Sequence, residues 1–223
     1  MRVGIRMGDL LFPETLEAKY HKCVDYLEAA HGFSIDRAEE LEHLRQVSER
    51  LAPMITDTIY YVNQAIDQGK RVIAEGANAL MLDLDYGSYP YVTSSPTGVA
   101  GICTGLGIAP NKVETAIGVV KAYTTRVGEG PFPTEDFGEA GEHMFTKGQE
   151  FGVTTGRKRR CGWLDMNIVR YTSMINGYSS INITKLDILD ELDEIKIATT
   201  YTINGKEVPS MPSNLEELAK CEP

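Results

Sequence analysis

The spacing of apolar residues predicts a mainly helical first third of the chain. Residues 13–50 are rich in Glu, Leu and His and have the pattern of one or two helices, with Gly32 as a break. Between Pro53 and Gly69, four apolar residues recur at spacings of four, three and four, which places them on one helix face: Ile55, Ile59, Val62 and Ile66. Glycine commonly follows the last helical residue, so Gly69 is expected to end this helix.

After Gly69 the pattern changes to short apolar segments separated by loops. Residues 71–76 predict a short buried strand, and residues 116–124 predict a central strand because they form a β-rich run. Asn204-Gly205 favours the type I′ turn of a hairpin between 195–203 and 206–208. The other predicted elements are helices over 98–108, 138–150 and 165–176, a strand over 180–184, and a terminal helix after Pro209.

This order of elements predicts an α/β fold with a mixed, largely parallel central sheet and flanking helices. We expect a single domain over residues 1–223, with a mainly helical part over 1–69 and a sheet part over 70–210.

The charge of the chain argues against two classes of partner. The sequence has 22 Lys and Arg against 32 Asp and Glu, a net charge of −10, which disfavours a general nucleic-acid or anionic-membrane binder. No apolar run reaches the roughly 18 residues of a membrane span, and the N-terminus has no apolar signal core. We therefore expect a cytoplasmic protein that binds neither nucleic acid nor membrane.

Cysteines and histidines give no sign of a metal site. The four cysteines are far apart and form no C-x-x-C pair, so we expect reduced thiols: Cys23, Cys103, Cys161 and Cys221. The four histidines also lack a metal-ligand pattern: His21, His31, His43 and His143.

Two neighbouring loops contain side chains suited to a nucleotide. Asn78 lies in the loop after the first predicted strand, where its amide could donate to and accept from a purine edge, or could complete a turn. Residues 87–96 place hydroxyl groups between aromatic residues and before a predicted helix. Such hydroxyl groups suit a phosphate, although Ser95 or Thr97 could instead cap that helix.

A run of four cations, Arg157 to Arg160, follows Gly152-Val153-Thr154-Thr155-Gly156. Arginine side chains match carboxylate and phosphate groups, which favours an anion-binding loop. A nucleic-acid patch is disfavoured by the net charge, and a solvated basic turn is the plain alternative.

Lys185-Leu186-Asp187 ends a predicted strand and resembles the Lys-x-Asp guanine-binding motif of GTPases. The Asp can accept two hydrogen bonds from guanine while the Lys stem lies on the base. The motif is common, and the sequence contains no G-x-x-x-x-G-K-[ST] phosphate loop beside it.

Taken in order, these segments resemble the adenylosuccinate synthetase family, in its eukaryotic and fungal form. The resemblance rests on the segments 75–78, 87–95, 125–135, 154–163 and 184–187 and extends from Arg2 to about residue 200. It implies a P-loop-GTPase-like ligase fold and a homodimer. The family joins L-aspartate to IMP with GTP and Mg²⁺, through 6-phosphoryl-IMP, and gives adenylosuccinate, GDP and phosphate.

The resemblance also implies a role for each matching residue. IMP contacts fall on Arg2 (across the dimer interface), Asn78, Leu82, Val92, Thr93, Val127, Gly128 and Arg157. Asn78 is in addition expected to contact the developing 6-oxyanion. Aspartate contacts fall on Val153, Thr154, Thr155, Gly156, Arg157, Lys158 and Arg159, and GTP contacts on Arg159, Lys185, Leu186 and Asp187.

The family's N-terminal phosphate loop, catalytic Asp and His, and Mg²⁺ ligands have no counterpart in these 223 residues. We therefore expect a truncated form, without a metal site of its own and inactive or nearly so when isolated. The alternative is a non-catalytic, purine-nucleotide-binding or dimerisation remnant of the family.

Overall fold

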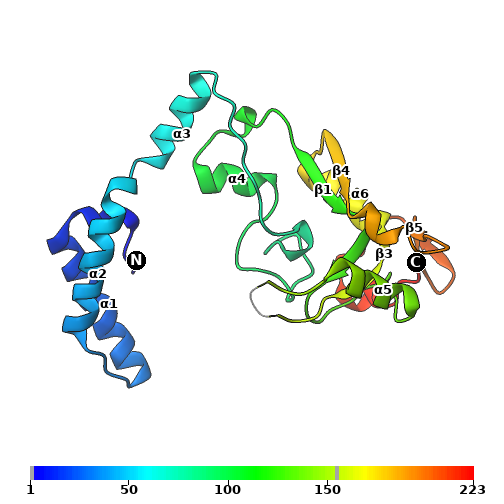
Figure 1. Ribbon diagram of the computed structural model, residues 1–223, viewed down its shortest axis with the longest axis horizontal. Helices are drawn as coiled ribbons and strands as arrows, with labels where there is room; N and C mark the ends of the chain where they lie inside the picture. The colour runs from blue at the N-terminus through cyan, green and yellow to red at the C-terminus, as the bar shows by residue number, and fades with distance from the viewer. Residues whose placement is uncertain (1–2, 154–155) are drawn as a thin grey trace. The chain divides into compact units, whose positions relative to one another are not determined.

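The computed structural model describes residues 3–153 and 156–223 (Figure 1). The chain divides into two compact units, Met1–Gly69 and Lys70–Pro223. Within the described ranges, the first unit contains helices without strands, and the strands lie in the second unit. The expectation of a single domain stays a prediction.

The first unit is built on two long helices, α1 (Pro13–His31) and α2 (Arg37–Leu51). Gly32 ends α1 with a left-handed backbone, φ 67°, and Asp36 caps α2 by accepting from two backbone N–H groups. The break expected at Gly32 is therefore confirmed. Tyr20, Val24 and Leu41 form the buried core between the two helices, and short 3₁₀ helices flank them: η1 (Met7–Leu11) and η2 (Ala52–Met54).

The third helix, α3 (Thr58–Asp67), confirms the predicted helix but starts later than Pro53. Asp57 caps it by accepting from the backbone of Tyr60, so the residues before Asp57, Ile55 included, lie outside the helix. The helix ends before Gly69, as expected. None of its residues is buried, and Ile59 is 59% exposed. The predicted apolar face exists, but no described part of the chain buries it.

The strand predicted at residues 71–76 is wrong. These residues have no regular structure and are exposed, Ile73 by 92%. A β-strand needs a hydrogen-bonded neighbour, and no described strand pairs with this segment. An apolar run alone therefore did not suffice to form a strand.

Among its described residues, the second unit holds seven strands in three small sheets. Strands β1 (Ile117–Lys121) and β4 (Ser180–Thr184) pair in parallel. Strand β3 (Arg160–Asp165) pairs antiparallel with β2 (Tyr123–Arg126) and parallel with β5 (Ile197–Ala198). The hairpin of β6 (Tyr201–Ile203) and β7 (Lys206–Val208) forms the third sheet. The predicted mixed α/β fold with parallel strands is confirmed.

The central strand expected at residues 116–124 is divided at Ala122. Lys121 pairs with Thr184 in one sheet, whereas Tyr123 pairs with Trp163 in another. Ala122 is buried between them and donates its N–H to the Thr184 carbonyl at 2.8 Å. The chain thus crosses from one sheet to the next within a single residue.

Helices connect these strands and cover them. The elements are η3 (Leu80–Leu82), α4 (Val99–Leu106), η4 (Pro110–Lys112), α5 (Glu139–Gly148), α6 (Met166–Asn176), η5 (Leu186–Leu189) and α7 (Leu215–Leu218). The three longer helices, α4, α5 and α6, confirm the predicted ones. Asp165 caps α6 through the N–H groups of Asn167 and Ile168.

Two buried clusters support the second unit. One contains Tyr123, Met144, Cys161 and Leu189 and joins β2, α5, β3 and η5. The other contains Tyr201, Met211, Leu218 and Cys221. All four cysteines are free, and burial raises the pKa of the Cys161 thiol to about 11.

Candidate functional site

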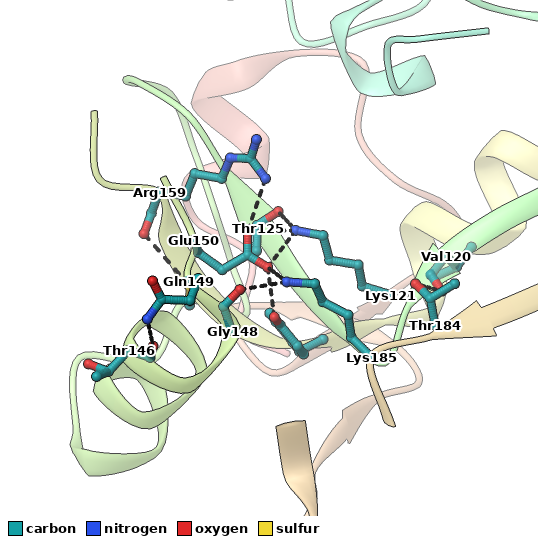
Figure 2. A network of polar contacts seen from close by, with 12 residues as sticks. Val120, Lys121, Thr125, Thr146, Gly148, Gln149, Glu150, Arg159, Thr184 and Lys185 are labelled. Atoms are coloured by element: carbon teal, nitrogen blue, oxygen red, sulfur yellow. Dashed lines mark hydrogen bonds and ion pairs between the residues drawn. The ribbon is translucent and has the colours of Figure 1, made fainter. Parts of the chain in front are cut away.

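A single buried carboxylate connects two of the segments selected from the sequence. Glu150 follows α5 and is 1% exposed. Its Oε1 accepts from the Tyr123 hydroxyl at 2.6 Å, Lys121 Nζ at 2.8 Å and Lys185 Nζ at 3.1 Å. Its Oε2 accepts from Lys121 Nζ at 2.8 Å and Arg159 Nη1 at 2.9 Å. These five residues are the Glu150 cluster, and Figure 2 labels Glu150 with Lys121, Arg159 and Lys185.

The cluster carries more positive than negative charge. Burial disfavours ionised Glu150, but hydrogen bonds from Lys121, Tyr123 and Lys185 outweigh it and hold the pKa of Glu150 at about 2. Burial lowers the pKa of Lys121, and the positive charges of Arg159 and Lys185 lower it further, against the opposing effect of Glu150. Three cations face one carboxylate, so an anionic ligand would find a favourable potential here.

Backbone pairing forms the base of the predicted aspartate loop. Arg159 N donates to Glu150 O at 2.9 Å, and Gly152 N donates to Arg157 O at 2.8 Å. Val153 is 97% exposed, and Gly156 has a left-handed backbone, φ 64°. Thr154 and Thr155 lie outside the described residues, as does Arg2.

The four cations that end this loop do not share one role. Arg157 and Lys158 are exposed, and Lys158 Nζ pairs with Glu142 at 2.8 Å and lies over the Phe145 ring. Arg160 makes a two-pronged contact with Glu135 and donates to the Gly130 carbonyl at 2.8 Å. Arg160 therefore fixes the loop base, whereas Arg159 belongs to the Glu150 cluster.

Lys185 lies between β4 and η5, and Asp187 lies in the first turn of η5. Lys185 has a left-handed backbone, φ 58°, and its Nζ donates to the Gly148 carbonyl at 2.6 Å as well as to Glu150. Leu186 and Asp187 are exposed. The Lys of the predicted guanine motif is thus held in place, and the Asp is exposed.

The loop that contains Val92 and Thr93 is fixed by backbone hydrogen bonds. Thr93 N donates to Leu82 O at 2.8 Å. Asp83, 2% exposed, accepts from Thr97 N at 2.6 Å, and also from the N–H groups of Asp85 and Tyr86. Leu82, Val92 and Thr93 are half-buried, and Asn78 is exposed at the bend that precedes η3.

Arg126 joins this loop to the segment that holds Val127 and Gly128. Its Nη2 donates to Ser88 Oγ at 3.0 Å and its Nε donates to the Glu129 carbonyl at 2.8 Å. Val127 and Gly128 are exposed, and Gly128 has a left-handed backbone, φ 79°. Two segments predicted to contact IMP, 87–95 and 127–128, are therefore brought together by one guanidinium.

Several residues that organise the site were not selected from the sequence: Lys121, Tyr123, Arg126 and Glu150. Glu150 had a local signal, since it is a lone acid four residues before the Thr pair of a basic loop. Lys121 and Tyr123 lie in strands outside the selected segments, whereas Arg126 lies within segment 125–135 and directly precedes Val127 and Gly128. In the described part of the chain no three His, Cys, Asp or Glu side chains gather to hold a metal ion. The described residues therefore offer no set of Mg²⁺ ligands.

Comparisons with known proteins identify the family of the chain. The family model described as adenylosuccinate synthetase matches residues 1–223. The adenylosuccinate synthetase of Schizosaccharomyces pombe is 53% identical over 222 residues, which are 99% of this chain and 51% of that protein. That of Paramecium tetraurelia is 55% identical over 224 residues, 100% of this chain and 52% of that protein.

A solved structure, the fully ligated adenylosuccinate synthetase of Plasmodium falciparum, superposes with a TM-score of 0.94 at 41% identity. The match covers 100% of this chain and 54% of the Plasmodium chain. The chain thus spans about half the length of the relatives it matches. Among the described helices, none is long and apolar enough to cross a membrane. On the match over its whole length and on its identity to relatives from fungi and a ciliate, this chain belongs to the adenylosuccinate synthetase family.

Proposed function

We propose that this chain supplies the IMP, L-aspartate and guanine contacts of an adenylosuccinate synthase. The reaction moves the γ-phosphoryl group of GTP to the 6-oxygen of IMP. The amino group of L-aspartate then displaces that phosphate, giving adenylosuccinate, GDP and phosphate. We further propose, from family membership alone, that the enzyme acts as a cytoplasmic homodimer in AMP biosynthesis, with Arg2 contributed across the dimer interface.

The observation that carries the proposal is the Glu150 cluster. It brings together Arg159 of the predicted aspartate loop and Lys185 of the predicted guanine motif within 3.1 Å of one carboxylate. Arginine suits carboxylate and phosphate oxygens because its planar nitrogens form paired hydrogen bonds. Exposed Asp187 would accept from the N1–H and 2-amino groups of guanine.

On the IMP side, the proposed contacts come from the segments that Arg126 joins. The Thr93 hydroxyl would bind the 5′-phosphate, with Leu82 and Val92 beside it, and Val127 and Gly128 would line the ribose pocket. The amide of Asn78 would contact the base and stabilise negative charge on its 6-oxygen. Residues 153–159 would close on aspartate, and Arg157 would also approach the ribose.

The test is a binding and turnover experiment on the purified chain. Isothermal titration with IMP, GDP and L-aspartate should show binding of each. The same chain with IMP, GTP, L-aspartate and Mg²⁺ should form no adenylosuccinate, because its 223 residues contain no G-x-x-x-x-G-K-[ST] motif to position the phosphates. A chain that binds none of the three ligands would refute the proposal. Turnover would refute the expected inactivity.

A further inference from the structure

The two oxygens of Glu150 serve different partners. Oε1 accepts from Lys185 and Tyr123, and Oε2 accepts from Arg159, while Lys121 bonds to both. Figure 2 shows Lys185 and Arg159 approaching the carboxylate from opposite sides. One side chain therefore lies between the segment proposed for guanine and the segment proposed for aspartate.

Lys185 depends on this contact for its position. Its left-handed backbone, φ 58°, is unfavourable for a residue with a long side chain. The bonds from its Nζ to Glu150 Oε1 and to Gly148 O tie the turn to the end of α5. Without the charge on Glu150, only the bond to the Gly148 carbonyl would hold the side chain that is proposed to lie on the base.

Arg159 depends on Glu150 in two ways. Its backbone N–H donates to the Glu150 carbonyl, and its Nη1 donates to Oε2. Its Nε is buried without a hydrogen-bond partner. Because a guanidinium is planar and rigid, a contact at Nη1 also fixes the direction of Nη2. Holding the fork in one direction before binding reduces the entropy that a ligand must remove.

We propose that Glu150 is a positioning residue that orients Lys185 for the guanine nucleotide and Arg159 for L-aspartate at the same time. The role is one of positioning because Glu150 itself is buried, with 1% of its surface exposed. The proposal rests on the proposed function, because it assigns those two ligands to the two segments. It predicts that a substitution of Glu150 weakens the binding of GDP and L-aspartate and leaves the binding of IMP unchanged.

Glu150→Gln is the decisive variant, because it keeps the shape and removes the charge. An amide has only one oxygen that accepts hydrogen bonds. Its NH₂ group would therefore face either the donors that now bond to Oε1 or those that bond to Oε2. Glu191→Gln is the matched control, since Glu191 forms an exposed ion pair with Lys147 of α5 and makes no contact with the five residues of the Glu150 cluster. Isothermal titration should be run with GDP, with IMP, and with L-aspartate in saturating IMP.

We expect Glu150→Gln to weaken GDP and L-aspartate binding by about tenfold or more each, the range typical of lost preorganisation. IMP binding should change by less than about threefold, and Glu191→Gln should match the wild type throughout. An equal loss of affinity for all three ligands would show that Glu150 has a merely structural role. Unchanged GDP or aspartate binding would likewise overturn the proposal.

Two further measurements keep the result decisive. If Glu150→Gln does not fold, Glu150→Asp retains the charge on a shorter stem that cannot reach all its partners, and it should weaken GDP or aspartate binding but not IMP binding. Hydrogen exchange without ligand should be faster in the variant at residues 156–160 and 184–187 together. A wild-type chain that binds none of the three ligands would instead refute the proposed function, whatever the exchange rates.

Discussion

Lys121 Nζ lies 2.8 Å from both carboxylate oxygens of Glu150, in a site where the carboxylate is 1% exposed. The lysine comes from the last residue of β1 and the glutamate from the turn after α5. Because burial separates Glu150 from solvent, its charge is stabilised by the protein and not by water. The stability of the second unit should therefore depend on pH through this residue.

The first prediction concerns that pH dependence. The pKa of Glu150 is held at about 2, below its ordinary value of 4.5, so the folded state binds the proton less readily than the unfolded state. The stabilisation by ionised Glu150 is thus complete above about pH 4.5 and is lost as the pH falls toward 2.

Urea unfolding of the wild type and Glu150→Gln from pH 7 to pH 2.5 would measure this. At pH 7 the variant should be less stable by about 2–3 kcal/mol, the cost of losing hydrogen bonds to a buried charge. The difference should shrink as the pH falls below 4.5. A difference that stays constant across this range would contradict the assignment of the lowered pKa to Glu150.

The second prediction compares two glycines of the second unit. At Gly162, which lies on β3, a Cβ added to the backbone would lie 2.1 Å from the Thr134 carbonyl oxygen and 2.7 Å from Glu135 Cα. These are backbone atoms that cannot rotate away, so Gly162→Ala should destabilise the protein by about 3 kcal/mol or more. Gly105, in α4, has open space around an added Cβ, and Gly105→Ala should stabilise it by up to about 1 kcal/mol.

Thermal unfolding followed by circular dichroism would distinguish the two variants, since the midpoint should fall for Gly162→Ala and rise slightly for Gly105→Ala. A Gly162→Ala protein as stable as the wild type would mean that β3 and residues 134–135 are not packed as described.

The third prediction tests the guanine assignment at Asp187. Replacing the carboxylate with an amide removes one acceptor and adds a donor, so Asp187→Asn should weaken GDP binding by about 100-fold or more. Xanthosine diphosphate has a carbonyl where guanine has its 2-amino group, and it should bind the variant better than GDP does. IMP titration is the internal control and should be unchanged. Retention of the wild-type preference for GDP would remove Asp187 from the proposed guanine site.

The fourth prediction tests the link between the two segments proposed for IMP. Arg126→Met keeps an apolar stem but loses the bonds to Ser88 and Glu129. Without them the Thr93 loop and residues 127–128 are no longer fixed to each other, and IMP binding should weaken by about tenfold. GDP binding should not change, since Lys185 and Asp187 do not contact Arg126. A parallel loss of IMP and GDP affinity would indicate general unfolding. An unchanged IMP affinity would exclude the proposed link between the Thr93 loop and residues 127–128.

The sequence by itself determined the helix ends, caps and turns that depend on only a few neighbouring residues. Gly32 ends a helix, Asp165 caps one, and Asn204-Gly205 forms a turn with both φ angles positive, 51° and 72°, as a type I′ turn requires. The five ordered segments were likewise sufficient to indicate the family, because motif order and residue type are properties of the sequence itself.

Tertiary contacts decided what a segment pairs with. The apolar run at residues 71–76 forms no strand because no described strand lies beside it, and Ala122 divides an apparently continuous strand because its two sides pair in different sheets. Residues Lys121, Glu150, Arg159 and Lys185 are up to 64 positions apart and meet only when β1, α5, β3 and β4 have packed. The sequence alone determined which chemistry the loops could supply. The tertiary structure decided that the Glu150 carboxylate holds the loops of Arg159 and Lys185 together. The burial of Glu150 and its pairing with cations depend on residues that are distant in the chain.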